Sequence, residues 1–275
     1  LAPGVTKDVT LVDCVIQGNI RNYGTGEVRF EAPQITPEST ATKPSEVYKP
    51  GATLDRTLEY GGKTVPIYRD RPLNVFSNVD FIWTGEENEN QRRLEYLGGE
   101  FRTRYGIDVS SFQGEIDWDA VADDNIDFAM VRVGFRGTGT GSLNTDKYYE
   151  QNIRGAMRAG LETGVYFFAQ AVTVEEAIEE ADYVISLLDG LDINGPVAYD
   201  WEMHDSTYRV YGTSPEMATA CAVAFCQRIK DAGYTPMVYG GTYVTYMKYD
   251  QGALADYLSW YPEYKSEKSE KLCPT

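Results

Sequence analysis

From residue 105 onward, short apolar runs alternate with longer stretches that have helical periodicity. This is the pattern of βα units arranged around a parallel sheet. The apolar runs predict six strands, at 106–110, 128–134, 164–169, 196–202, 236–240 and 258–261. Because the runs are apolar on both faces, we expect a buried sheet, either a barrel or a doubly wound sheet. In both architectures functional side chains gather at the carboxyl ends of the strands.

Two helices in this region carry start signals. Thr173-Val174-Glu175-Glu176 is a capping box, in which the threonine hydroxyl and a glutamate each satisfy a free backbone amide. Apolar residues then recur at spacings of four, three and four, which predicts one apolar stripe facing the sheet. The solvent side of this helix is expected to hold Glu175, Glu179, Glu180 and Asp182. A second helix is predicted to begin at Ser214-Pro215 and to end near Ala232-Gly233.

The first 104 residues differ, because they hold seven of the twelve prolines and no sustained helical period. The Pro, Ser and Thr-rich segment 35–51 indicates a linker or extended arm. Short strands are predicted at 9–17, 27–31, 64–68 and 75–83, with Gly61-Gly62 as a turn. We therefore expect two parts. Residues 1–104 would form a β-rich module, an arm or an elaboration packed on the barrel, and residues 105–275 the α/β domain.

The net charge and the spacing of the cysteines argue against several classes of function. The formal net charge of −17, divided as −2 before residue 105 and −15 after it, argues against binding to nucleic acid or to an anionic membrane surface. No apolar run approaches the roughly 18 residues of a membrane-spanning helix. The four cysteines match neither a zinc site nor a CxxC pair, and Cys221 and Cys226 are expected to be buried thiols on one helix. We expect no metal and no cofactor.

The strongest local signal for chemistry is Asp200-x-Glu202 at the end of a predicted buried strand. Residues two apart on a strand point to the same face, so the two carboxylates share one pocket, with their Cβ atoms about 6–7 Å apart. The negative charge of one raises the pKa of the other, so one can act as a proton donor while its partner stays anionic. The spacing alone is as typical of a solvated rim or a set of metal ligands as of a catalytic pair.

Two other signals carry less weight. The glycine-rich loop 137–141 follows a strand but lacks the lysine of a phosphate-binding P-loop, so we interpret it as a loop beside the cleft. His204 is the only histidine and no cysteine pair is near it. A solvent-facing loop position is therefore favoured over a metal ligand or a base.

Four segments together resemble a known family: 105–114 (YGIDVSSFQG), 128–134 (FAMVRVG), 164–171 (GVYFFAQA) and 196–202 (PVAYDWE). In this order they are similar to glycoside hydrolase family 25, the lysozymes of streptomycetes, phages and Gram-positive bacteria. The resemblance covers nearly all of residues 105–264. It implies a flattened, irregular TIM-like (β/α) barrel that cleaves the β-1,4 bond between N-acetylmuramic acid and N-acetylglucosamine in peptidoglycan.

The resemblance also implies roles for three acids. Glu202 would be the general acid, and Asp200 would orient the 2-acetamido group of the substrate, which attacks the anomeric carbon. Asp108 would complete the acidic cluster, although Asp-x-Ser-Ser is also common turn chemistry. Tyr166, Tyr239 and Trp260 would offer rings to the sugar, with core packing as the alternative for each. Arg132, on a buried strand, needs a carboxylate partner, which the cluster can provide, and a structural ion pair is the alternative.

The sequence departs from the family in its last part. The resemblance implies eight strands, but six are predicted before the charged run 265–271, so we expect the C-terminal barrel strands to be missing and sheet edges to be open. Phe167 and Trp201 are expected to point away from the pocket, because they alternate with the residues that face it.

The favoured interpretation is a peptidoglycan hydrolase. Its partner would be the glycan strand, and its location extracellular or cell-wall associated, as the substrate requires, although the N-terminus shows no signal sequence. The alternatives are a non-catalytic cell-wall carbohydrate-binding protein and a chitinase-like N-acetylhexosaminidase.

Overall fold

The computed structural model describes the strands between residues 9 and 36, and residues 41–71, 76–85 and 92–264. It separates into two compact units, Leu1–Lys43 and Pro44–Thr275. In the first unit two pairs of strands run parallel, β1 (Val9–Val12) with β3 (Val28–Glu31) and β2 (Val15–Gln17) with β4 (Gln34–Thr36). The strands predicted at 9–17 and 27–31 are therefore present, the first as two separate strands.

The second unit is built around one sheet whose six parallel strands match the six predicted runs. They are β9 (Gly106–Val109), β10 (Phe128–Arg136), β12 (Glu162–Ala169), β13 (Val197–Trp201), β14 (Pro236–Tyr239) and β15 (Leu258–Trp260). From β10 the order is β12, β13, β14 and β15, and β9 pairs with the first half of β10 on its other side. A seventh strand, β11 (Leu143–Thr145), pairs antiparallel with the end of β10. The sequence analysis missed β11, because three residues after a glycine-rich loop carry no strand periodicity.

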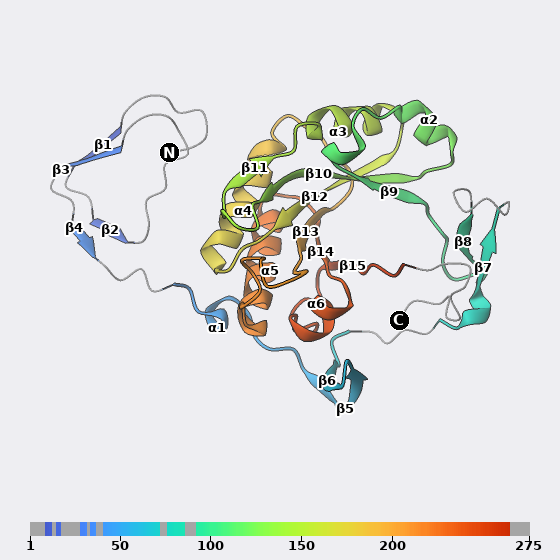
Figure 1. The fold of residues 1–275 in the computed structure, drawn as a ribbon, viewed down its shortest axis with the longest axis horizontal. Coiled ribbons are helices and arrows are strands. Elements are labelled where there is room, and N and C mark those ends of the chain that lie inside the picture. The colour runs from blue at the N-terminus through green and yellow to red at the C-terminus, as the bar shows by residue number, and fades with distance from the viewer. Residues whose placement is uncertain are drawn as a thin grey trace. The chain divides into compact units, whose positions relative to one another are not determined.

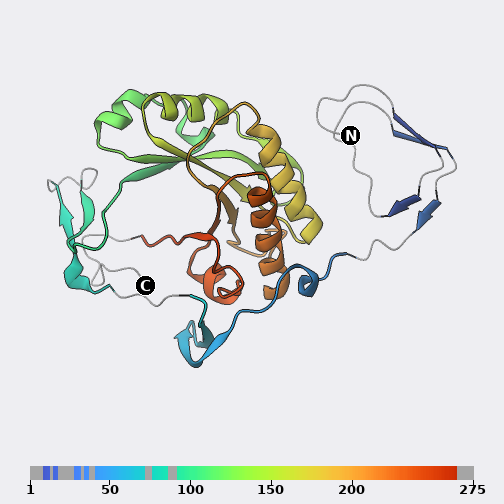
Figure 2. The same cartoon turned by 180° about the vertical axis from the view of Figure 1, so that it is seen from behind.

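The sheet is strongly curled and its helices cover the outer face (Figure 1). The helices that pack on its strands are α3 (Tyr149–Arg158), α4 (Val174–Leu187) and α5 (Pro215–Asp231). Two shorter helices, α2 (Trp118–Asp123) and α6 (Thr242–Met247), follow β9 and β14 in the chain. Figure 2 shows α4 and α5 side by side on this face. The predicted class, an irregular α/β barrel-like fold with a small N-terminal β region, is confirmed. Among the residues that the structure describes, six parallel strands form the barrel wall, so β9 and β15 each leave one edge open.

The core lies between the sheet and its helices. Every residue of β13 is buried, and the Tyr199 ring packs 4.7 Å from Phe225 of α5, centroid to centroid. Phe167 and Trp201 are fully buried and do not line the cleft, as predicted. The Trp201 indole donates to the Ala171 carbonyl at 3.0 Å, so its polar atom is satisfied within the core.

The capping box predicted at α4 forms in part. The Thr173 hydroxyl accepts a hydrogen bond from the Glu176 amide at 3.2 Å. The Glu176 carboxylate instead accepts from the Val172 amide at 2.9 Å and pairs with Arg209. The expectation that Glu180 lies on the solvent side is wrong: Glu180 is fully buried and pairs with Arg136 of β10 at 2.7 Å.

The start and end predicted for α5 are confirmed. It begins at Pro215, with Ser214 as its cap, and Ala232 is the residue that ends it. Cys221 and Cys226 of this helix are buried free thiols, as predicted. The other two cysteines, Cys14 and Cys273, lie outside the described residues.

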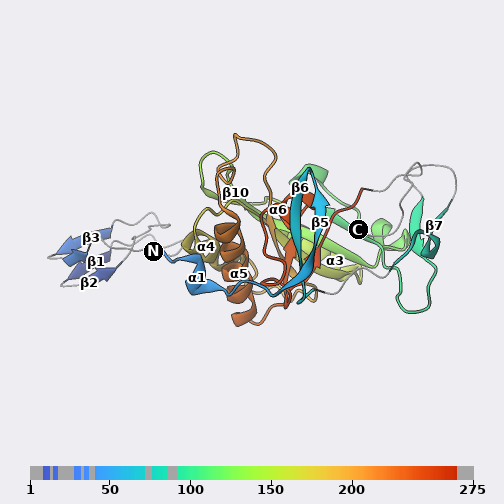
Figure 3. The same ribbon diagram turned by 90° about the horizontal axis from the view of Figure 1, so that it is seen from below.

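Residues 44–71, at the start of the second unit, pack against α5, α6 and residues 250–254. Helix α1 (Pro44–Val47) packs on α5, and Arg71 donates to the carbonyl of Leu254 at 2.8 Å. Strands β5 (Thr53–Tyr60) and β6 (Lys63–Tyr68) form a hairpin, and the predicted Gly61-Gly62 turn has the positive φ angles, 56° and 74°, that favour glycine. Figure 3 shows this hairpin next to α6, where the rings of Tyr60 and Tyr246 lie 5.6 Å apart.

A second hairpin precedes β9. It consists of β7 (Phe81–Thr84) and β8 (Arg93–Tyr96), after a 3-10 turn at Asn78–Asp80. The strand predicted at 75–83 is therefore only partly right, because the chain makes a helical turn before β7 starts. Position 75 itself lies outside the described residues. The division of the chain after residue 104 stays a prediction.

Candidate active site

The three acids singled out from the sequence line one cavity at the carboxyl end of the sheet. Asp108 lies in β9, Asp200 in β13, and Glu202 directly follows β13. The cavity has a volume of about 550 Å³, and we call it the acid cleft. The acids meet there because parallel strands end at the same edge of the sheet and because Asp200 and Glu202 share one face of their strand.

The three acids differ in exposure. Asp200 is only 6% exposed, whereas 24% of the Glu202 side chain is accessible. Burial, together with the nearby Glu202 and Asp108 charges, raises the pKa of Asp200 well above its usual range, and Arg132 offsets only part of this. Asp108 is exposed, but partial desolvation in the cleft and the Glu202 charge still raise its pKa, although a backbone hydrogen bond acts to lower it. The cluster therefore resists complete ionisation and can keep a proton available to a bound molecule.

Arg132 lines the acid cleft, but it pairs with a different acid and also donates to the Ser111 hydroxyl at 3.2 Å, so the structural ion pair is the arrangement found. Its Nε and Nη2 donate to Oδ2 of Asp146 at 3.0 and 2.8 Å. Asp146 also accepts from the amides of Ser111 and Tyr148. Although burial acts to raise the pKa of Asp146, these hydrogen bonds lower it. Asp146 thus ties the loop after β9 to β10, and the sequence analysis did not identify it.

The three predicted aromatic residues form the wall of the acid cleft opposite β9. Tyr166 is on β12, Tyr239 on β14 and Trp260 on β15, and all three line the cavity. The Trp260 ring lies edge-to-face with both tyrosines, at centroid distances of 6.1 Å to Tyr166 and 5.1 Å to Tyr239. Burial raises the pKa of both tyrosines, so their hydroxyls remain protonated hydrogen-bond donors at neutral pH. These side chains therefore pack against one another and also line the cleft.

Two side chains hold Glu202 from outside the acid cluster. Gln170 donates its side-chain amide to the Glu202 carbonyl at 2.7 Å. His204 places Nε2 2.7 Å from the carboxylate oxygen Oε2 of Glu202. The histidine is 63% exposed, as predicted for a loop residue, but its contact with the acid was not predicted. Its position two residues after Glu202 was the available signal.

Phe112 was also missed, and it lies at the rim of the cleft. Its side chain is 84% exposed, and the Arg132 guanidinium lies 5.0 Å from its ring centroid. A flat apolar ring beside a cavity is a suitable surface for a pyranose. The cleft therefore combines a proton source, an anionic group and flat rings, which suits acid-assisted cleavage of a polymer made of rings.

The described residues contain no group of three or more His, Cys, Asp or Glu placed to hold a metal ion. In the same part of the chain, no helix has the length and apolar character to span a membrane.

Comparison with known proteins gives a family match. The sequence profile of "Glycosyl hydrolases family 25" matches residues 107–273. An autolytic lysozyme of Clostridium acetobutylicum is 26% identical over 164 residues, 59% of this chain and 46% of that protein. Lysozyme M1 of Streptomyces globisporus is 30% identical over 112 residues, 40% of this chain and 36% of that protein. The chain thus matches less than half the length of either relative.

Solved structures of similar fold include a family 25 glycosyl hydrolase from Bacillus anthracis. It is 19% identical and has a TM-score of 0.47, covering 68% of this chain and 79% of that one.

Proposed function

The chain belongs to the glycosyl hydrolases family 25, and from this premise we propose that it is a peptidoglycan hydrolase. The bond cleaved would be the β-1,4 bond between N-acetylmuramic acid and N-acetylglucosamine. The observation that carries the proposal is the meeting of Asp108, Asp200 and Glu202 in one cleft beside three aromatic rings. The relatives named as lysozymes support the same class of substrate.

In this proposal the chemistry begins with proton transfer from Glu202. It is the more accessible of the paired acids, and it donates its proton to the glycosidic oxygen as the bond to the anomeric carbon breaks. The oxygen of the substrate's acetamido group attacks the same carbon, so no enzyme nucleophile is needed. Water then attacks the anomeric carbon, and the bond between this carbon and the acetamido oxygen breaks, which restores the acetamido group. The Glu202 carboxylate takes a proton from the attacking water and is again a carboxylic acid.

Asp200 would orient and polarise the acetamido group. A buried carboxylate next to a developing positive charge stabilises it more strongly than one in water, because little solvent screens the interaction. Substrate-assisted glycosidases fall outside the rule that links carboxylate separation to stereochemistry, so the distance between the acids predicts no stereochemical outcome here.

Asp108 would complete the negative field, and the remaining cleft residues would bind sugar. Tyr166, Tyr239 and Trp260 offer ring faces and, for the tyrosines, hydroxyl donors. Arg132 contributes a positive charge next to the cluster while its Asp146 pair fixes its position. Such an enzyme would act outside the cell or in the cell wall, where its substrate lies.

The proposal is tested by incubating the protein with purified peptidoglycan and identifying the new reducing ends. New muramic-acid ends that disappear in Glu202→Gln are expected. The matched control is Glu150→Gln, an exposed glutamate paired only with Arg154 on the surface of α3. Binding without release would indicate the carbohydrate-binding alternative, and release from chitin oligomers alone would indicate the chitinase-like one.

A further inference from the structure

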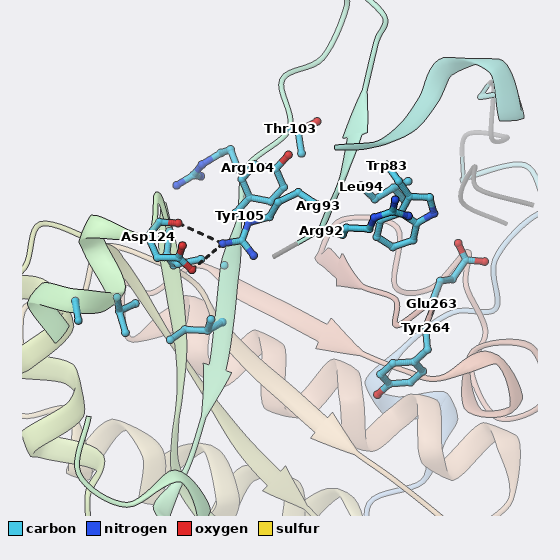
Figure 4. A pocket seen from close by; sticks show the side chains of 15 residues that line it. Trp83, Arg92, Arg93, Leu94, Thr103, Arg104, Tyr105, Asp124, Glu263 and Tyr264 are labelled. Atoms are coloured by element: carbon cyan, nitrogen blue, oxygen red, sulfur yellow. Dashed lines mark hydrogen bonds and ion pairs between the residues drawn. The ribbon is translucent and has the colours of Figure 1, made fainter. Parts of the chain in front are cut away.

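A second cavity, larger than the acid cleft, lies between the β7–β8 hairpin and the start of β9, and we call it the hairpin pocket (Figure 4). Its volume is about 780 Å³. Trp83, Arg92 and Arg93 of the hairpin form one wall, and Glu263 and Tyr264 come from the segment after β15. No step of the proposed reaction uses it.

The hairpin pocket and the acid cleft are neighbours along one strand. Gly106 and Ile107 of β9 line the hairpin pocket, and Asp108 lines the acid cleft. Glu263 and Tyr264 line both cavities. Since a strand rises about 3.3 Å per residue, Gly106 and Asp108 lie about 7 Å apart. A peptide attached to a glycan in the acid cleft would, if extended, reach the hairpin pocket within about three of its own residues.

Basic side chains gather in the hairpin pocket of a chain whose net charge is −17. Arg92 and Arg93 line it together with two carboxylates, Asp124 and Glu263. Arg104 also belongs to the lining, but its guanidinium lies against Glu162 and Phe128, outside the pocket. A guanidinium presents paired donors that match the two oxygens of a carboxylate. The pocket therefore presents guanidinium donors to an anion in a chain that is acidic as a whole.

Arg93 has a partner that a ligand can displace. It pairs with Asp124 at 2.8 Å, but the Asp124 side chain is 71% exposed. An exposed pair of this kind contributes about 0–1 kcal/mol, so replacing the protein carboxylate with one from a ligand costs little.

A buried donor in the same wall lacks an acceptor. The indole N–H of Trp83 is buried and has no hydrogen-bond partner within residues 41–71, 76–85 and 92–264. Leaving such a donor unsatisfied costs about 1–3 kcal/mol. A carbonyl or carboxylate oxygen of a ligand would satisfy it, and the Tyr105 and Tyr264 rings beside it suit the apolar stems of a peptide.

We infer that the hairpin pocket binds the carboxylate-bearing peptide side chain of a glycan strand whose sugars lie in the acid cleft. This inference rests on the proposed function, because only a glycan with peptide side chains brings both groups to these adjoining cavities. The hairpin would then make the enzyme prefer strands that still carry their peptides.

The test compares peptide-bearing glycan strands with the same strands stripped of peptide by an amidase. The wild-type kcat/KM is expected to be at least about tenfold higher on the peptide-bearing strands, equivalent to about 1.4 kcal/mol. The Arg92→Gln/Arg93→Gln variant is expected to reduce this ratio to below about threefold, mainly through KM. Trp83→Phe, which keeps the ring but removes the N–H donor, should reduce it partially. Arg154→Gln, an exposed arginine of α3, is the control that should keep the wild-type ratio.

A parallel binding measurement separates this inference from the proposed function. With Glu202→Gln, calorimetric titration compares a disaccharide carrying a peptide with the bare disaccharide. Tighter binding of the peptide form that is lost on adding Arg92→Gln/Arg93→Gln supports the pocket, even if the wild type cleaves neither substrate. Equal binding of both forms, or equal loss on both, overturns it, even if the wild type cleaves peptidoglycan. Thermal unfolding of each variant shows whether the hairpin is still folded.

Discussion

The second unit contains two groups of three acids that differ in their ion-pair partners. In the acid cleft, Asp108, Asp200 and Glu202 face one another, and the nearest arginine pairs with Asp146. On α4, Glu176, Glu179 and Glu180 each form an ion pair, the first with Arg209 and the other two with Arg136.

This difference distinguishes the acids that we assign to the reaction from the acids that stabilise the fold. Hydrogen bonds from Arg209 and Val172 lower the pKa of Glu176 although burial opposes them, whereas burial and like charges raise the pKa of Asp200. Even Glu180, whose pKa burial raises to about 7, has Arg136 at 2.7 Å to stabilise its charge. We interpret the acids paired with arginine as structural. The cleft acids have no such arginine partner among the described residues, and the contact to Glu202 comes from the exposed His204 at 2.7 Å. This suits a proton donor, which must be able to change its protonation state.

The largest effect is expected from a substitution of one of the cleft acids. Glu202→Gln keeps the shape of the side chain but removes its transferable proton, so we expect kcat on peptidoglycan to fall about 10²–10⁴-fold. Steady-state release of reducing ends, with Glu150→Gln as control, measures this. The unfolding temperature should change little. Retention of more than a tenth of the wild-type kcat would show that Glu202 is not the acid.

The next largest effect is expected from a substitution of one of the ion-paired acids of α4. Glu180→Ala removes the acid that shares the buried Arg136 with Glu179, and we expect the free energy of unfolding to fall by about 3–5 kcal/mol. Urea denaturation measures it, and Glu150→Ala, which breaks an exposed pair, should change it by less than about 1 kcal/mol. A loss as small as that of the control would mean that the Arg136 pair contributes nothing to the fold.

The same comparison shows what the sequence could predict. The strands and the pair Asp200 and Glu202 could be predicted because they depend on local pattern, an apolar run and a two-residue register. Asp108 was found through the family resemblance of residues 105–114 and not from such a pattern. Glu180 was assigned to solvent because helical periodicity cannot reveal that its partner, Arg136, lies 44 residues earlier on a strand. Asp146 was missed for the same reason, since its role depends on Arg132 in the adjacent strand of a hairpin that was itself not predicted.

The smallest effect concerns pH. If ionised Asp200 orients the acetamido group, the acidic limb of the kcat/KM profile follows its pKa, which Asp108 helps to raise. Asp108→Asn removes that negative charge and lowers the pKa of Asp200, so the limb should move to lower pH. A pH series from 3 to 8 on soluble glycan fragments would record it. If the limb stays in place or moves to higher pH, the Asp108 charge does not raise the pKa of Asp200.

Asp200→Asn tests most directly whether the cleft keeps its acids for chemistry at the expense of stability. Because the folded-state pKa of Asp200 is raised, the stability linked to its neutral form is complete below about pH 4 and is lost as pH rises through the folded pKa. The neutral amide avoids this loss. At pH 7 the variant should therefore be inactive yet about 1 kcal/mol more stable than the wild type, with the gain disappearing below pH 4. A variant that is less stable at pH 7, or one that still cleaves peptidoglycan at the wild-type rate, would contradict the account.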